Sequence, residues 1–232
     1  MKPKSSLLEM LKAGVHFGHQ TFRWHPSMKP FIFTSKNNVH IIDLEKTQEQ
    51  LEKVLEFVYK VSAKRGQVLF VGTKRQAKEP IKKAAQKVDM PYVVDRWLGG
   101  TFTNFPTIRK QSDKLEKYSK EKEEDLKKRY TKKERLIRQR KVDKLKKSFE
   151  GLLSMKRLPQ ALFAVDIKNE KNAIMEARKK GIPVIAIVDT NSDVRGIDYP
   201  IPANDDAVKV IQMMCDEITS AILEAKRAKS KD

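Results

Sequence analysis

Three short runs of consecutive apolar residues constrain the fold of this chain more than any other feature: Val68–Val71, Ala161–Val165 and Val184–Val188. A strand without polar residues has to be covered on both faces, as in a parallel sheet with helices on each side. Patterns typical of helices lie between and around these runs, at residues 44–64, at residues 169–180 and after Asp206. The sequence therefore predicts an α/β fold with a parallel sheet.

The ends of several other elements are marked by local signals. Ser6 and Glu9 have capping-box spacing, which predicts a helix over Leu7–Ala13 that ends at Gly14. Residues 31–34 and 39–42 flank Ser35-Lys-Asn-Asn38 and predict a hairpin with a basic tip. We expect Asp43 to cap the helix over residues 44–64, and Gly66 to end it.

Five further expectations concern the later part of the chain. Residues 92–95 are expected to form a strand, and the helix after Val68–Val71 to start near Glu79, because Pro80 suits a first helical turn. Asp205 or Asp206 is expected to cap the last helix, on whose apolar side Cys215 lies as a core residue. Residues 226–232 are expected to form a frayed polar tail.

The charge of the chain points to a polyanionic partner. The formal net charge is +19 and the isoelectric point is near 9.9, which favours nucleic acid. No run approaches the ~18 apolar residues of a membrane span, and the amino terminus turns polar too soon for a signal peptide. The single cysteine excludes an internal disulfide and indicates a reducing compartment.

Much of this charge lies in one segment. Residues 107–157 contain 20 Lys and Arg against 9 Asp and Glu, so 11 of the 19 net charges lie there. A second capping box at Thr131 and Glu134 predicts two long helices with a break at residues 123–130. Apolar residues at nearly heptad spacing predict an antiparallel coiled-coil hairpin that protrudes from the globular part: Ile108, Leu115, Tyr118, Val142, Leu145, Phe149 and Leu152. We therefore expect an α/β domain of residues 1–105 and 158–232, and a helical insertion of residues 106–157.

A second basic segment precedes the first apolar run. Residues 13–42 contain no Asp or Glu, and Arg23, Trp24 and Lys29 interleave cationic and aromatic groups as RNA loops require. Three histidines in the same region, His16, His19 and His25, raise the alternative of a zinc site. That alternative is disfavoured, because structural zinc sites recruit four Cys or His ligands and no cysteine lies nearby.

Lys74 and Arg75 follow the first apolar run and leave two interpretations open. They either contact RNA phosphates or are merely solvated. Neither of the glycine-rich phosphate-binding motifs is present, which disfavours a nucleotide site. An enzyme with a degenerate nucleotide-binding core, using Lys74 with Asp189 or Asp193 at the sheet edge, is the rival hypothesis. A calcium loop starting at Asp189 is rejected, because Val194 replaces the glycine that such a loop needs.

Residues 96–105 join the predicted sheet to the charged segment. Two adjacent glycines give this stretch unusual backbone freedom. Trp97 and Phe102 are interpreted as packing residues, and Arg96 as the cation available for contact. The stretch is therefore expected to be a junction between the globular core and the helical insertion.

Several ordered blocks of the sequence resemble the small-subunit ribosomal protein S-two family of bacteria or organelles. They include Gly14-Val-His-Phe-Gly-His19, Val71-Gly-Thr-Lys-Arg-Gln-Ala77, Arg96-Trp-Leu-Gly-Gly-Thr101 and residues 159–166, 181–193 and 201–206. Phe105-Pro106 departs from the Trp-Lys usual in the family, which shifts the expected start of the first insertion helix.

The resemblance implies a flavodoxin-like three-layer sandwich with a parallel sheet and a protruding helical coiled-coil hairpin. It implies a structural constituent of the small ribosomal subunit that lies between head and body, binds small-subunit rRNA and helps to recruit the neighbouring S-one protein. A ribosome-bound, cytoplasmic protein that supports translation is expected, without catalysis, cofactor, metal, membrane contact or homo-oligomer. A protein-recruiting surface, on the hairpin or elsewhere, is compatible with this hypothesis.

Nine residues are expected to contact rRNA, by phosphate pairing or, for the tryptophan, by stacking. They are Arg23, Trp24, Lys29, Lys36, Lys74, Arg75, Arg96, Arg109 and Lys110.

Overall fold

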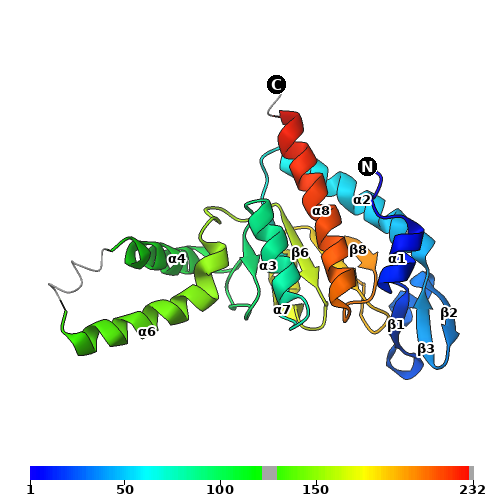
Figure 1. The fold of residues 1–232 in the computed structure, drawn as a ribbon, viewed down its shortest axis with the longest axis horizontal. Coiled ribbons are helices and arrows are strands. Elements are labelled where there is room, and N and C mark those ends of the chain that lie inside the picture. Colours follow the sequence, from blue (N-terminus) through cyan, green and yellow to red (C-terminus); the bar gives the residue numbers. More distant parts are fainter. Residues whose placement is uncertain (122–129, 230–232) are drawn as a thin grey trace.

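The computed structural model describes residues 1–121 and 130–229 of the chain (Figure 1). Short 3-10 helices are labelled η. The elements in chain order are α1 (Leu7–Ala13), β1 (Phe17–Gln20), η1 (Thr21–Arg23), η2 (Pro26–Phe31), β2 (Ile32–Lys36), β3 (Val39–Ile42), α2 (Leu44–Ala63), β4 (Val68–Val71), α3 (Lys78–Lys87), β5 (Tyr92–Val93), α4 (Phe105–Lys120), α6 (Lys132–Phe149), η3 (Glu150–Leu152), β6 (Ala161–Val165), α7 (Lys171–Lys179), β7 (Val184–Val188), β8 (Tyr199–Pro202) and α8 (Val208–Lys229).

A five-stranded parallel sheet forms the centre of the molecule. Its strand order is β5-β4-β6-β7-β8, with every neighbouring pair parallel. Numbered along the chain this is the 2-1-3-4-5 order of flavodoxin-like folds. The three apolar runs form the central strands β4, β6 and β7, and all their residues are buried. The predicted α/β fold class is confirmed.

The two faces of the sheet are covered by different elements. Val68 and Phe70 of β4 pack in a core with α2, α3 and α8, whereas Leu69 and Val71 point to the opposite face. That second face packs against α7, residues of the 97–105 loop, and the inner sides of α4 and α6. Cys215 of α8 is fully buried in the first core, as expected.

A second, antiparallel sheet of three strands has the order β1-β3-β2. The predicted hairpin forms its β2–β3 part, and Asn37 and Asn38 take the positive φ angles of 51° and 60° that a tight hairpin turn needs. Strand β1 was not predicted, because its Gly-His composition gives no strand signal. In Figure 1 this sheet and helix α4 lie at opposite ends of the molecule.

Helices α4 and α6 extend side by side away from the parallel sheet (Figure 1). Five of the seven apolar residues that define the predicted seam are buried: Ile108, Leu115, Val142, Phe149 and Leu152. Pro106 lies in the first turn of α4, where its missing N–H costs nothing. The expected break at residues 123–130 falls mostly on residues 122–129, which lie outside the described residues.

Most of the predicted helix ends agree with the structure, but some boundaries were wrong. Both capping boxes form, and Asp43 caps α2. Neither Asp205 nor Asp206 caps α8; instead Asn204 Oδ1 accepts the backbone N–H groups of Asp206 and Ala207. The two carboxylates turn inward toward a lysine, which a local sequence pattern does not reveal.

The remaining differences are small. Strand β5 is only two residues long, because the chain turns away and Asp95 pairs with Lys78 at 2.9 Å. Arg65 (φ 56°), rather than Gly66, takes the left-handed conformation after α2. Strand β8 was missed because Pro200 and Pro202 argue against a strand, but an edge strand tolerates them. The expected tail is helical as far as Lys229, and residues 230–232 lie outside the described residues.

Among the helices of the described residues, each is too short or too polar to cross a membrane.

Gly72 directly follows β4, and its backbone packs so closely against Ala77 and α3 that a side chain does not fit. A Cβ atom at Gly72 would lie 2.9 Å from both Ala77 Cβ and Ile81 Cγ1, whereas a Cβ at Gly99 would meet nothing within 4 Å. We expect Gly72→Ala to lower the free energy of unfolding by about 1–3 kcal/mol through overpacking, and Gly99→Ala to change it by less than about 0.5 kcal/mol. Urea unfolding of both variants checks this, and equal effects would contradict it.

Candidate nucleic-acid interface

The acid-free stretch exposes an aromatic and cationic surface. Phe22 and Arg23 lie in η1 with the Phe22 ring 75% exposed and the Arg23 guanidinium 5.4 Å from its centre. The backbone N–H of Thr21 donates to Asn38 O at 2.9 Å, which joins η1 to the β2–β3 turn and its exposed Lys36. We call Phe22, Arg23, Trp24 and Lys36 the N-terminal basic patch.

Trp24 is less available than Phe22. Its side chain is 38% exposed and its ring lies 5.5 Å from the ring of His40. Lys29 is exposed on η2. Phe22 was not among the residues predicted to contact rRNA. Its neighbouring cation in the sequence, Arg23, was the signal that could have singled it out.

Lys74 lies at the carboxyl edge of the parallel sheet, among carboxylates rather than in solvent. Its side chain is 14% exposed, and its Nζ lies 2.6 Å from Asp205 Oδ1, 2.7 Å from Asp206 Oδ1 and 3.6 Å from Asp166 Oδ2. Burial opposes the charged ammonium, but the bonds to Asp205 and Asp206 outweigh it and raise the pKa of Lys74. Lys74 therefore acts as the internal cation of this cluster.

The carboxylate of Asp205 is almost completely buried, with its side chain 1% exposed. Burial and the neighbouring carboxylates of Asp166 and Asp189 raise the pKa of Asp205, and Lys74 offsets only part of that rise. The cluster thus holds more carboxylates than one lysine neutralises. A histidine contacts two of these carboxylates.

His19 connects β1 to the same edge of the sheet. Its Nδ1 lies 3.0 Å from Asp189 Oδ1 and its Nε2 lies 3.6 Å from Asp206 Oδ2. The hydrogen bond with Asp189 raises the pKa of His19 despite burial, because it favours the charged ring. The backbone N–H of His19 also donates to Thr190 Oγ1 at 2.8 Å, so both polar ends of the residue are engaged.

The three histidines of the alternative zinc site each contact a different group of the protein. His25 Nδ1 lies 2.7 Å from Ser27 Oγ, and the ring of His16 lies against that of Phe17 at 4.0 Å. In the described part of the chain, the one group with the spacing of metal ligands is His19, Asp205 and Asp206. Both carboxylates of that group already bind the Lys74 ammonium. The arrangement is an ion-pair network.

The hypothesis of a nucleotide-dependent enzyme requires carboxylates and backbone N–H groups that are free to bind a substrate. In the structure, the groups named below already have partners within the protein. Asp189 is buried and accepts from its neighbour Thr190 N, while Asp193 pairs with Arg195 at 2.8 Å. The N–H groups of Ala77 and Lys78 at the start of α3 donate to Lys74 O, so these two are not free to cradle a phosphate.

Of the other residues predicted to contact rRNA, three are exposed and Arg109 is bound to groups within the protein. Arg75, Arg96 and Lys110 are exposed. Arg109 Nη1 donates to Leu153 O at 3.1 Å and its Nη2 pairs with Asp113 at 2.6 Å, so its guanidinium ties α4 to the segment after η3. Trp97 and Phe102 are buried with their rings edge to face at 5.0 Å, which confirms the interpretation of both as packing residues.

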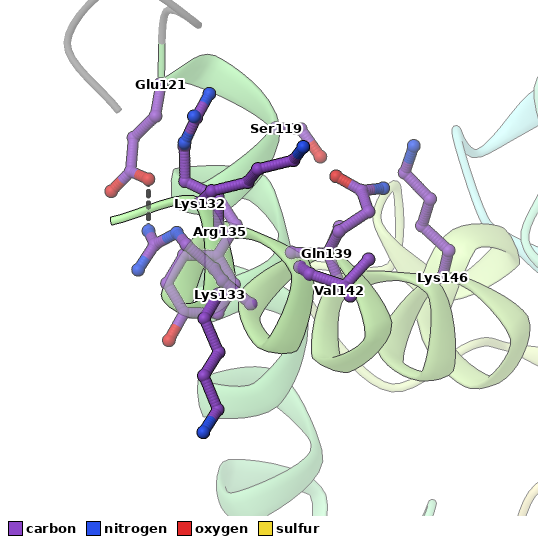
Figure 2. A pocket seen from close by; sticks show the side chains of 11 residues that line it. Ser119, Glu121, Lys132, Lys133, Arg135, Gln139, Val142 and Lys146 are labelled. Atoms are coloured by element: carbon purple, nitrogen blue, oxygen red, sulfur yellow. Dashed lines mark hydrogen bonds and ion pairs between the residues drawn. The ribbon is translucent and has the colours of Figure 1, made fainter. Parts of the chain in front are cut away.

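A groove with a volume of about 980 Å³ lies between α4 and α6 (Figure 2). Among the described residues, five cations line it: Lys132, Lys133, Arg135, Arg138 and Lys146. Glu121 pairs with Arg138, whose guanidinium also stacks 4.3 Å from the Tyr118 ring. The charge count had located this basic segment, but only the packing of the two helices shows which cations share a groove.

Comparison with known proteins gives a consistent result. A family model described as ribosomal protein S2 matches residues 10–225. The small ribosomal subunit protein uS2 of Coprothermobacter proteolyticus is 49% identical over 224 residues, which cover 97% of this chain and 84% of the relative. The protein of the same name from Aeromonas salmonicida is 48% identical over 223 residues, which cover 96% of this chain and 92% of the relative.

Lys74→Met tests the structural role of the buried lysine. The substitution leaves the carboxylates of Asp166 and Asp205 without their cation, so we expect the free energy of unfolding at pH 7 to fall by about 3 kcal/mol. Arg75→Met is the matched control, because Arg75 is the next residue and exposed; its effect should stay below about 0.5 kcal/mol. Denaturant unfolding measures both, and a stable Lys74→Met variant would contradict the assignment.

Proposed function

The chain belongs to the ribosomal protein S2 family, and from that membership we propose that it is a structural constituent of the small ribosomal subunit that binds small-subunit rRNA. The family is a structural, non-enzymatic component of the ribosome, so the hypothesis of a nucleotide-dependent enzyme was wrong. In this proposal the protein is ribosome-bound in the cytoplasm, supports translation and carries no cofactor.

The single observation that carries the rRNA proposal is the exposed N-terminal basic patch. Phosphate contacts need solvent-accessible cations, and RNA loops stack unpaired bases on accessible aromatic faces. Arg23 and Lys36 supply the cations and Phe22 supplies the face, in a stretch of thirty residues, 13–42, without a carboxylate. No acidic residue within that stretch repels the RNA backbone.

The proposed contacts follow from exposure. Phosphate contacts are assigned to Arg23, Lys29, Lys36, Arg75, Arg96 and Lys110, all of which are exposed. Stacking is assigned to Phe22 first and to Trp24 second. Lys74 and Arg109 are assigned structural roles instead, because carboxylates or backbone carbonyls already bind their charged groups.

The proposal treats residues 1–105 and 158–232 as one α/β domain and residues 106–157 as a helical coiled-coil insertion. The insertion carries the cations that line the groove between α4 and α6 (Figure 2). These cations extend the rRNA-binding surface beyond the globular part, because phosphate binding is dominated by accumulated positive charge.

Recruitment of the neighbouring S-one protein, at a position between head and body, is the second part of the proposal. It is supported by an apolar surface on which Leu8 of α1 is 60% exposed and Phe33 of β2 is 74% exposed. Leu8 and Phe33 line a groove of about 520 Å³ together with Asp43 and Glu45, and these two carboxylates disfavour a phosphate partner. Exposed apolar patches of this kind mark protein–protein contacts. One copy of the chain per subunit is expected.

Sedimentation of a cell lysate tests the ribosomal assignment. The protein should cosediment with small ribosomal subunits in a sucrose gradient and remain with them at moderate salt, because packed and paired contacts resist screening. A soluble nucleotide-binding enzyme from the same lysate, which should stay at the top of the gradient, is the control. Recovery of the protein only in the soluble fraction would refute the proposal.

Two substitutions test the N-terminal basic patch directly. Lys36→Gln should lower the salt-dependence slope of binding to a small-subunit rRNA transcript by about one, since one phosphate contact is lost. Phe22→Ala should weaken binding by about 1–3 kcal/mol if a base stacks on the ring. Lys60→Gln is the control with the same change of charge, because Lys60 pairs with Glu56 on α2. Binding that does not depend on salt would contradict the electrostatic interpretation.

A further inference from the structure

The loop between β5 and α4 is held by one carboxylate from a distant element. Glu176 of α7 accepts five hydrogen bonds from this loop, although more than seventy residues separate the two in the sequence. Its Oε1 accepts from Trp97 Nε1 at 3.1 Å and from Gly100 N at 2.8 Å. Its Oε2 accepts from Phe102 N at 2.9 Å and from Thr103 N and Oγ1 at 3.1 and 3.0 Å.

Both oxygens of Glu176 are therefore fully used, because a carboxylate offers about four lone-pair sites. The loop itself brings the donors together. Gly100 has φ of 92°, a left-handed conformation that bends the backbone so that successive N–H groups point to one side. Burial disfavours the charged carboxylate, but the N–H groups of Thr103, Gly100 and Phe102 and the Trp97 indole outweigh it and lower the pKa of Glu176.

The held loop leads directly into α4. Asn104 precedes that helix without capping it through its side chain, and the first turn of α4 contains no acidic residue. The start of α4 therefore has Pro106 as its local signal but no side-chain cap such as the Ser6 capping box of α1. Its direction depends on the loop before it. Helix α6 contacts α4, for example where the Arg138 guanidinium lies 4.3 Å from the centre of the Tyr118 ring, so its position depends on that of α4.

We propose that Glu176 is the positioning residue that fixes the direction in which α4 and α6 leave the parallel sheet. Five bonds from one side chain hold the last residues before α4 against α7, which is itself packed on the sheet. The apolar contacts of Ile108 and Phe149 with the core press the helices onto the sheet but are not directional. Glu176 supplies the directional bonds to α7, and with them the orientation of the basic groove, whereas the Arg109 bond to Leu153 O joins α4 to the segment after η3.

A distance measurement between the sheet and α6 tests this inference without RNA, so its failure is separable from failure of the rRNA proposal. Spin labels are placed on Cys residues introduced at the exposed positions Arg140 of α6 and Lys209 of α8, in a Cys215→Ala background. The distance distribution should be narrow with Glu176 present. Glu176→Gln should broaden it clearly, because the amide turns a donor toward N–H groups that need an acceptor.

Glu217→Gln is the matched control. Glu217 of α8 accepts from Lys4 N and from Ser5 N and Oγ, so it also anchors a backbone segment, but that segment is the amino terminus. The control should leave the distance distribution unchanged. A distribution in folded Glu176→Gln as narrow as in the parent protein would overturn the inference, and so would equal broadening in the control.

Trp97→Phe provides a milder variant if Glu176→Gln does not fold. It removes one of the five donors and retains an aromatic ring, and it should broaden the same distribution to a smaller extent. Hydrogen exchange supplies a second measurement, in which the amides of Gly100, Phe102 and Thr103 should exchange faster than in the parent protein. Unchanged exchange and an unchanged distribution in Trp97→Phe would together refute the inference.

The acid dependence of stability has a defined sign. A carboxylate whose pKa is lowered by folding contributes stability that is present above its unfolded pKa and is lost as the pH falls through the folded pKa. The difference in unfolding free energy between the parent protein and Glu176→Gln should therefore be full at pH 7 and shrink below about pH 4. A difference that grows on acidification would show that the substitution acts by another route.

Discussion

The ammonium group of Lys74 is the contact through which the loops at the carboxyl edge of the sheet are joined. It binds Asp166 after β6 and Asp205 and Asp206 after β8, while Lys74 itself follows β4. His19 bridges Asp189 and Asp206 and so brings β1 into the same network. Charges buried to this extent are stable only when they are paired, so the network permits one arrangement of these loops. The N-terminal basic patch is built on that fixed edge.

An anchor of opposite sign lies on the face of the sheet that α7 covers. There a single carboxylate, Glu176, satisfies the N–H groups of the loop before α4. Each anchor binds a segment that has no regular structure of its own, because unpaired backbone or charged groups at these positions would be costly. Other cations are exposed and therefore suited to bind an external polyanion, among them Arg23, Arg75 and Arg96.

The elements that could be predicted are those whose signals are local. The apolar runs gave β4, β6 and β7, and the capping boxes gave the starts of α1 and α6. Strands β1 and β8 were missed because Gly, His and Pro carry no strand preference, and only pairing with β3 and β7 makes them strands. Among the candidate contacts, the sequence did not distinguish Lys74 from Arg75, since the main partner of Lys74 is 131 residues away.

The sequence by itself determined the parallel α/β core, the basic character of the chain and most helix ends, because these depend on hydrophobic periodicity, net charge and neighbouring residues. Only the tertiary structure decided which cations face solvent, which acidic groups hold Lys74 and that Glu176 binds the loop before α4. Those outcomes depend on pairs of groups far apart in the chain, and such pairs meet only after the sheet and its helices have packed.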